Sequence, residues 1–384
     1  MGTRVENLWR DERGMSFVWV GMGFMAFFAA TTLAIDVGMF MTARSQAQNA
    51  ADAGALAGAT ALVFDDYYDR DDDGPAKMSA MNTAKENDVM RIDVSVEPED
   101  VTFPLGPDGY DNRVHVNVFR TADRNNPVAA LIGPIFGIPT VNIGAQATAE
   151  ASPANAMTCV KPFTIPDRWT ENGFPDWDPG DTFDRYDDHS AAVLPNADVY
   201  NRPGSGRYSG YHPTRDKGML LTIRASNEGN IEPSMYYTWA MPGGIGGDPY
   251  RENISGCNTT EVEPGDLLLH EPGDKVGPTS QGIDDLIAQD PNAYWDDTNK
   301  RVVTTMKPSP RVFPIPLFDP DYYEWGRVNG RVADLKVSNW IGFFVVGRTG
   351  AEVHGRVVPI QGIIKGGAGP APNDIFPKVI RLVE

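Results

Sequence analysis

The sequence is poor in the residues from which metal sites and nucleophilic sites are built. Its 384 residues include five histidines and two cysteines. No two histidines stand at the H-x-H or H-x-x-x-H spacing that is typical of zinc ligands. The Gly-x-Ser-x-Gly elbow of hydrolases and the Walker loop of nucleotide-binding proteins are also missing. The sequence therefore carries no recognised enzyme motif, and we predict a protein that is not an enzyme.

Positive charge is also scarce. Lys and Arg number 33 against 52 Asp and Glu, which leaves a formal net charge of −19. Nucleic acid is excluded as a partner, because phosphate binding needs clustered cations. The acidic residues are spread through loops rich in Gly and Pro, a pattern typical of a solvated surface. An apolar fraction of 41% is nevertheless sufficient for a folded core.

Charge is absent from one long run near the N-terminus. Residues 15–35, "MSFVWVGMGFMAFFAATTLAI", contain no charged side chain and are long enough to cross a bilayer as a helix. Arg4, Arg10 and Arg13 precede the run and Arg44 follows it, so the distribution of cations predicts a cytoplasmic N-terminus. A cleaved signal peptide is the alternative, but the run is longer than a usual signal core and lacks a small-x-small exit.

The helix is expected to continue beyond the membrane. Residues 36–64 are rich in Ala and Gln, and no proline occurs before Pro75, so one helix is predicted over residues 15–64. Its outer half carries small residues, with Gly54 and Gly58 at G-x-x-x-G spacing. Such a surface favours close packing against other helices, and we expect those of other subunits.

These residues also carry a family resemblance. Arg13 and Gly14 precede the apolar run, an Asp-Val-Gly step follows at residues 36–38, and "QAQNAADAGALAG" occupies residues 46–58. This segment resembles the Tad (tight adherence, or Flp pilus-assembly) proteins of the TadG and TadE-like type. The resemblance implies a bacterial inner-membrane protein with one span, a periplasmic or extracellular body, and a non-enzymatic role in pilus assembly. Its partners would be other pilus or export-machinery subunits, which the N-terminal helix would contact.

The chain departs from related families at two points. Pilins that are cut after a glycine have Glu at the fifth position after the cut, whereas the fifth residue after Gly14 is Trp19. Processing between Gly14 and Met15 therefore stays open. Longer TadG proteins often carry a von Willebrand A-type domain with an Asp-x-Ser-x-Ser metal motif, which this sequence lacks. Adhesion through such a metal site is not implied.

The remaining chain predicts an α+β fold in four segments. These are a cytoplasmic N-terminus (1–14), the transmembrane and extended helix (15–64), a pilin-like α+β region (65–155), and a mostly β, sandwich-like C-terminal domain (156–384). A helix is expected across residues 76–87, strands at 91–98, 113–120 and 140–150, and a short apolar helix at 126–137. Within the last segment one helix is expected between Ser280 and Pro291.

Three acidic clusters are candidate sites. Asp69, Asp71, Asp73 and Gly74 match the opening of a calcium loop, but Ala80 stands where an EF-hand needs Glu. Calcium and a solvated acidic turn are both open there, and no other cofactor is predicted. The other two clusters are calcium-like or acid-base candidates whose alternative is an exposed loop; they comprise Asp176, Asp178 and Asp181, and Asp184, Asp187, Asp188 and His189.

Cys159 and Cys257 both follow the apolar run, so they lie on the same side of the membrane. Outside the cytoplasm such a pair is more often a disulfide than a metal site, and two free, buried thiols stay open as the alternative. Two other functions are also open. One is a tethered module that binds calcium-dependent or glycan partners through loops with Trp169, Trp177 and Trp239. The other is a tethered hydrolase with an acidic site.

Overall fold

The chain divides into two compact units in a computed structural model that describes residues 15–65, 69–107, 109–172, 177–226, 230–271, 273, 275–330, 334–367 and 371–383. The first unit comprises Met1–Ala59, Arg70–Ala149 and Leu382–Glu384, and the second comprises Thr60–Asp69 and Glu150–Arg381. The predicted cytoplasmic segment 1–14, with Gly14, lies outside the described residues.

Helix α1 runs over Met15–Phe64, as the absence of proline predicts. Its two halves differ in exposure. Side chains of the apolar run stand free, Phe17 with 82% and Phe24 with 68% of their surface exposed. From Ala43 onward one face is buried, and alanines at i, i+4 and i+7 spacing form it (Ala43, Ala47, Ala50, Ala51, Ala55 and Ala59). The N-terminal half of α1 therefore has a mostly exposed apolar surface, whereas one face of its C-terminal half is covered by the first unit.

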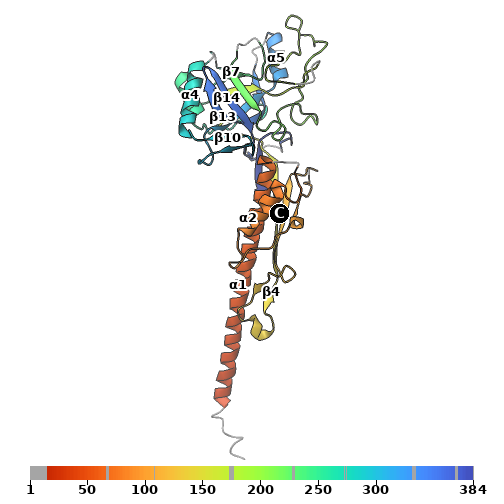
Figure 1. Cartoon of the computed structure of the whole chain (residues 1–384), viewed down its shortest axis with the longest axis vertical. Coiled ribbons are helices and arrows are strands. Elements are labelled where there is room, and N and C mark those ends of the chain that lie inside the picture. The colour runs from red at the N-terminus through yellow and green to blue at the C-terminus, as the bar shows by residue number, and fades with distance from the viewer. Residues whose placement is uncertain are drawn as a thin grey trace, which may run out of the picture. The chain divides into compact units, whose positions relative to one another are not determined.

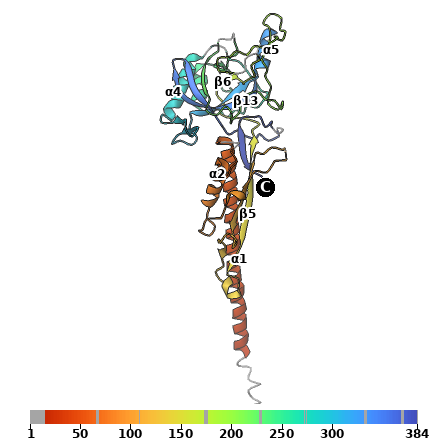
Figure 2. The ribbon, with the colours of Figure 1, turned by 45° about the vertical axis from the view of Figure 1, so that its right-hand side comes forward.

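The cover consists of one helix and a small sheet. Helix α2 (Pro75–Lys85) begins with proline at its first position, where no backbone N–H is needed, and lies against the C-terminal half of α1 (Figure 1). The sheet has the order β1-β2-β5-β15, formed by β1 (Val101–Thr102), β2 (Arg113–Arg120), β5 (Ile143–Pro153) and β15 (Lys378–Leu382). A 3-10 turn, η1 (Pro98–Asp100), precedes β1. Figure 2 shows β5 alongside α1, where Gln48 donates to the carbonyl of Gln146 at 2.9 Å.

The helix expected at 126–137 is not formed, and that prediction is wrong. Two short strands, β3 (Val128–Ala129) and β4 (Thr140–Val141), pair antiparallel, with the 3-10 turn η2 (Gly133–Phe136) between them. Proline at positions 127, 134 and 139 and a left-handed Gly137 stop a longer helix. Residues 91–98 likewise form only isolated bridges, such as Ser95 with Phe119, rather than a full strand.

The second unit contains a closed β-barrel rather than the expected sandwich. Its strands follow the order β12-β6-β8-β7-β14-β13-β9, and β12 also pairs with β13, which closes the ring. The strands are β6 (Phe163–Pro166), β7 (Leu220–Ala225), β8 (Met235–Thr238), β9 (Leu267–Leu268), β12 (Val312–Phe318), β13 (Leu335–Thr349) and β14 (Glu352–Val358). Strand β13 pairs with β12 on one edge and with β14 on the other, and a register shift between Val345 and Gly347 marks a bulge in its pairing with β14.

Three helices and a hairpin complete this unit. Helix α4 (Val276–Gln289) is the one expected before Pro291, although it begins earlier, and α3 (Gly247–Ser255) packs on it, with Gly282 against Ile254. Helix α5 (Pro320–Val328) was not predicted, although Asp319 caps it by accepting the N–H of Tyr322 at 2.9 Å. The hairpin pairs β10 (Tyr294–Asp296) with β11 (Arg301–Val303).

Candidate functional site

Asp36 is buried against a loop that lies almost a hundred residues further along the chain. Its carboxylate, 5% exposed, accepts the backbone N–H groups of Leu131 at 3.0 Å, Ile132 at 3.1 Å and Gly133 at 2.7 Å. These are the free amides at the start of η2, so the carboxylate serves as their cap. A side chain at Gly133 would come within 2.2 Å of the carbonyl oxygen of Ile138. The arrangement holds the β3–β4 loop on α1 at the first residue after the apolar run.

The small residues of the outer half pack within the chain itself. A Cβ atom at Gly54 would lie 2.9 Å from the carbonyl oxygen of Ala80, and one at Gly58 would lie 2.7 Å from a methyl group of Val114. Ser79 of α2 also donates to the carbonyl of Ala57 at 3.2 Å. Our expectation that these two glycines face other subunits is therefore corrected. Their lack of side chains lets α2 and β2 approach the backbone of α1 closely.

Comparison with known proteins places this helix in a family. Residues 14–61 match the sequence model of Tad, which is described as putative Flp pilus-assembly TadE/G-like. The N-terminal helix is a Tad-type segment. No curated protein and no solved structure matches the chain. By length and composition, the helix is also long and apolar enough to cross a membrane. The Tad-type segment thus contains Asp36 and both packed glycines.

The Asp36 contact yields the first testable prediction. Asp36→Ala leaves three amide groups without their acceptor, and the loss of such a charge-assisted contact costs about 1 to 3 kcal/mol locally. We expect the amides of Leu131, Ile132 and Gly133 to exchange with deuterium about 10- to 100-fold faster. Hydrogen exchange with mass spectrometry on the detergent-solubilised chain measures this.

Asp36→Asn is the matched control, because it keeps one acceptor oxygen and should give an intermediate rate. Exchange in α2, which contacts α1 at Gly54 and Gly58 instead, should stay unchanged in both variants. Equal rates for the parent chain and Asp36→Ala would contradict a role of the carboxylate in holding the loop.

The acidic turn that precedes α2 shows no assembled metal site. Among the side chains that the structure describes, no three His, Cys, Asp or Glu residues lie close enough together to hold a metal ion. Asp69, Asp71 and Asp73 are among these described side chains and do not form such a group. The neighbouring cations already have partners, since Arg70 pairs with Asp111 at 3.3 Å and Lys77 with Asp72 at 2.8 Å. Calcium binding at this turn stays a prediction, which calorimetric titration with calcium tests.

The other acidic clusters form turns. Asp178 accepts the N–H of Gly180 and Asp181 accepts that of Asp178, both at 2.6 Å, while Asp176 lies outside the described residues. Asp187 accepts the hydroxyl group of Ser190 and the backbone N–H groups of Ser190 and His189, and these bonds lower the pKa of its carboxyl group. Asp188 pairs with Arg327 at 3.1 Å. These carboxylates stabilise turns and pair with Arg327, and a calcium or acid-base role for the two clusters stays a prediction.

Two of the three tryptophans expected to bind a glycan are buried, and Trp177 is half-buried. Trp169 is 1% and Trp239 is 4% exposed, and both belong to the main core of the second unit. Trp177 packs edge-on against Trp169 and Tyr211. The rings contribute to core stability, because aromatic pairs of this geometry add to the burial of their apolar surface. Trp169 and Trp239 therefore offer no exposed ring to a glycan, and the binding-module alternative stays a prediction.

Cys159 and Cys257 form a disulfide. It joins the segment before β6 to the end of α3 across 98 residues of sequence. Beside it, the N–H of Cys159 donates to the carbonyl of Asn258 at 2.9 Å. The sequence left both a disulfide and two free thiols open, and the structure contains the disulfide.

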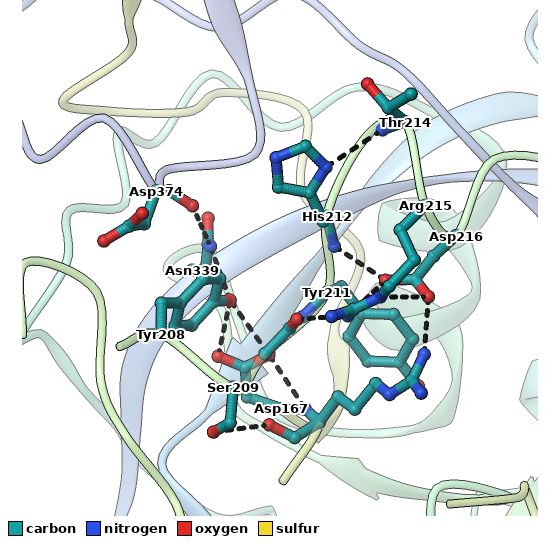
Figure 3. A network of polar contacts seen from close by, with 12 residues as sticks. Asp167, Tyr208, Ser209, Tyr211, His212, Thr214, Arg215, Asp216, Asn339 and Asp374 are labelled. Carbon is teal, nitrogen blue, oxygen red and sulfur yellow. Dashed lines mark hydrogen bonds and ion pairs between the residues drawn. The ribbon is translucent and has the colours of Figure 1, made fainter. Parts of the chain in front are cut away.

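A network of polar contacts in the second unit surrounds Asp167, which directly follows β6 (Figure 3). This carboxylate has no exposed surface. It accepts the hydroxyl groups of Tyr200 at 2.8 Å, Tyr208 at 2.9 Å and Ser338 at 3.1 Å. Tyr208 in turn accepts from the side-chain amide of Asn339 at 2.8 Å. Residues far apart in sequence are thus joined at the end of one barrel strand.

A second carboxylate extends this network. Asp216 accepts from Arg168 at 2.6 Å and from the backbone N–H of His212 at 2.7 Å, and Arg215 donates to it as well (Figure 3). Arg168 also lies over the ring of Trp177, 4.4 Å from its centre. Neither Asp167 nor Asp216 was singled out from the sequence, because their partners come from distant loops. Both carboxylates are buried and bind side chains from several loops, which favours a structural role in fixing these loops to the barrel.

Buried carboxyl groups make stability depend on pH, and Asp167 and Glu324 are two of them. Burial raises the pKa of Asp167 to about 6 and that of Glu324 to about 7, although hydrogen bonds oppose both shifts. Between about pH 4.5 and 7 the folded chain therefore keeps protons that the unfolded chain has lost. The free energy of unfolding of the second unit should rise as the pH falls through this window. Burial lowers the pKa of His212, which works in the opposite direction.

A comparison with Glu324→Gln isolates one of these groups. Acidification from pH 7.5 to 5 should raise the free energy of unfolding by about 2 kcal/mol less in the variant than in the parent chain. Contributions from Asp167 and His212 are the same in both chains and cancel when the two are compared. Thermal unfolding monitored by circular dichroism at both pH values measures the gain. The prediction fails if the two chains respond to acidification equally.

Proposed function

We propose that the protein is a non-enzymatic, membrane-anchored component of Tad/Flp pilus assembly. The observation that carries this proposal is the Tad-type match over residues 14–61, which coincides with a helix able to cross a membrane. The helix would hold the chain in the bacterial inner membrane as a single span, and the barrel unit would act as a scaffold outside the cytoplasm.

Charge and disulfide chemistry support this orientation. Three arginines precede the apolar run and one follows it closely, which favours a cytoplasmic N-terminus. The Cys159–Cys257 disulfide suits an oxidising compartment such as the periplasm or the cell surface. Both observations favour the same topology for the body.

The partner surface on α1 is the face that the first unit leaves uncovered. Gly54 and Gly58 are occupied by α2 and β2, whereas Val37 is 43% and Met41 is 70% exposed. Gly38 lies between them, and a Cβ atom there would meet nothing within 4 Å. These residues share one side of the helix by their spacing. We propose that this side contacts other pilus or export-machinery subunits.

Complementation of a deletion strain tests the proposal. The strain would receive the full chain, the chain carrying Gly38→Leu, or a chain whose residues 1–35 are replaced by a cleavable signal peptide. We expect the full chain to restore surface pili and adhesion, the released body to restore neither, and Gly38→Leu to reduce pilus number without lowering the amount of protein in the membrane.

Electron microscopy of surface pili and membrane fractionation provide the two readouts. A deletion strain that still forms normal pili would remove pilus assembly from the proposal. Full activity of the released body would remove the anchor. Normal assembly with Gly38→Leu would leave the anchor in place and remove the proposed partner surface.

A further inference from the structure

The loop between β3 and β4 presents apolar side chains at one end of the first unit. Ile135 is 78% exposed, Leu131 69%, Phe136 60% and Ile138 55%. The sequence around them carries no charged residue from Asn125 to Ala149, although charged residues make up 22% of the chain. Large apolar side chains gathered on one loop, without charge between them, indicate a surface that contacts something apolar.

The loop is built firmly enough to present these side chains together. The N–H of Ala130 donates to the carbonyl of Pro139 at 3.0 Å, and the N–H of Ile138 donates to that of Gly133 at 2.9 Å. The amides of residues 131–133 are held by Asp36. The backbone is therefore satisfied internally, and the apolar side chains are directed away from it.

The position of the loop along α1 identifies what it contacts. Asp36 immediately follows the uncharged run 15–35, and Thr32, one turn nearer the N-terminus, is also buried, with 5% of its surface exposed. Figure 1 shows the β4 hairpin nearer the N-terminal end of α1 than α2 lies. If α1 crosses a bilayer with this run, the loop reaches the boundary between headgroups and acyl chains.

We propose that the β3–β4 loop is a second membrane contact, inserting Leu131, Ile135, Phe136 and Ile138 into the leaflet on the side where the body lies. This inference rests on the membrane anchor of the proposed function. The partner is the lipid surface itself, because the loop is continuous with the apolar surface of α1 and is uncharged. Together the helix and the loop set the tilt and rotation of the first unit on the membrane.

A fluorophore placed on the loop tests this inference in the full chain. Phe136→Cys offers a single reactive thiol, since Cys159 and Cys257 are bonded to each other. The labelled protein, reconstituted into phosphatidylcholine vesicles, would be exposed to lipids that carry a nitroxide quencher either in the headgroup or deep in the acyl chain. We expect shallow quenchers to reduce the emission several-fold more than deep ones.

Two matched positions serve as controls. Phe24→Cys lies in the apolar run and should be quenched best by the deep nitroxide. Leu105→Cys is the second control, because Leu105 is 67% exposed in the same unit. Leu105 precedes β2 in the chain, and Val114 near the start of that strand packs against Gly58. Since Gly58 is 22 residues beyond Asp36 in the helix, this label should lie about 30 Å further from the membrane and escape quenching.

The outcomes separate the inference from the proposed function. Quenching of the Phe136→Cys label no stronger than that of Leu105→Cys, with Phe24→Cys quenched, would overturn the loop contact and leave the anchor intact. If none of the three labels is quenched, the membrane anchor is overturned and the inference with it. If the Phe136→Cys signal changes with the density of protein in the vesicles but not with the lipid quencher, the loop contacts a second copy of the chain and the lipid contact is overturned.

Discussion

Gly58→Leu should separate α2 and β2 from the Tad-type helix. A side chain at this position would begin with a Cβ atom 2.7 Å from a methyl group of Val114, 3.1 Å from the Cβ of Ala80 and 3.2 Å from the carbonyl oxygen of Ala76. A leucine needs still more room, and overpacking of this kind costs about 3 kcal/mol in a tightly packed contact. Pulse proteolysis of the detergent-solubilised chain in urea measures the loss.

Gly38→Leu is the matched control within the same helix. A Cβ atom at Gly38 meets nothing within 4 Å, and leucine is a better helix former than glycine, so stability should be unchanged or slightly higher. The pair of variants separates packing inside the chain from contact with other subunits. Equal stability of the two variants would contradict the close approach of α2 to Gly58.

Removal of the disulfide should have the largest effect on the second unit. Replacement of Cys159 and Cys257 by serine frees a loop with a sequence separation of 98 residues. The chain-entropy model assigns about 4 to 5 kcal/mol to closure of a loop of this length. We expect the melting temperature of the second unit to fall by about 10 °C or more, as measured by differential scanning calorimetry.

Reduction provides the control for this experiment. Cys257 lies at the surface, so dithiothreitol should reach the bond in the parent chain and lower its melting temperature to that of the double variant. The double variant itself should not respond to the reductant. A parent chain that melts at the same temperature as the double variant under oxidising conditions would show that the bond contributes little.

Local patterns were sufficient for several elements. The uncharged run and the absence of proline predict α1 over residues 15–64, and the alternation of Val114, Val116 and Val118 predicts β2. Each signal is repeated over many residues, so single exceptions do not obscure it. Proline at position 75 likewise marks the start of α2.

Other elements depended on partners that no local pattern reveals. The apolar stretch at 126–137 predicts a short helix, but it forms strand β3 and a loop. Leu131, Ile135 and Phe136 stay exposed there, and Asp36 accepts the amides of residues 131–133. The barrel closes because β12 pairs with β13 as well as with β6, a matter of register between distant strands. Periodicity shows which face of a strand is buried, but it does not show which strand lies beside it.

The sequence by itself determined a long helix over residues 15–64, with large apolar residues in its first half and small residues in its second, and a body that is acidic and mostly β. Only the tertiary structure decided what that helix contacts. The second half is covered by α2 and β2 at Gly54 and Gly58, and Asp36 holds a distant apolar loop beside the apolar run. The reason is physical, because helix formation follows from local propensity, whereas the partner of each face depends on contacts across the whole chain.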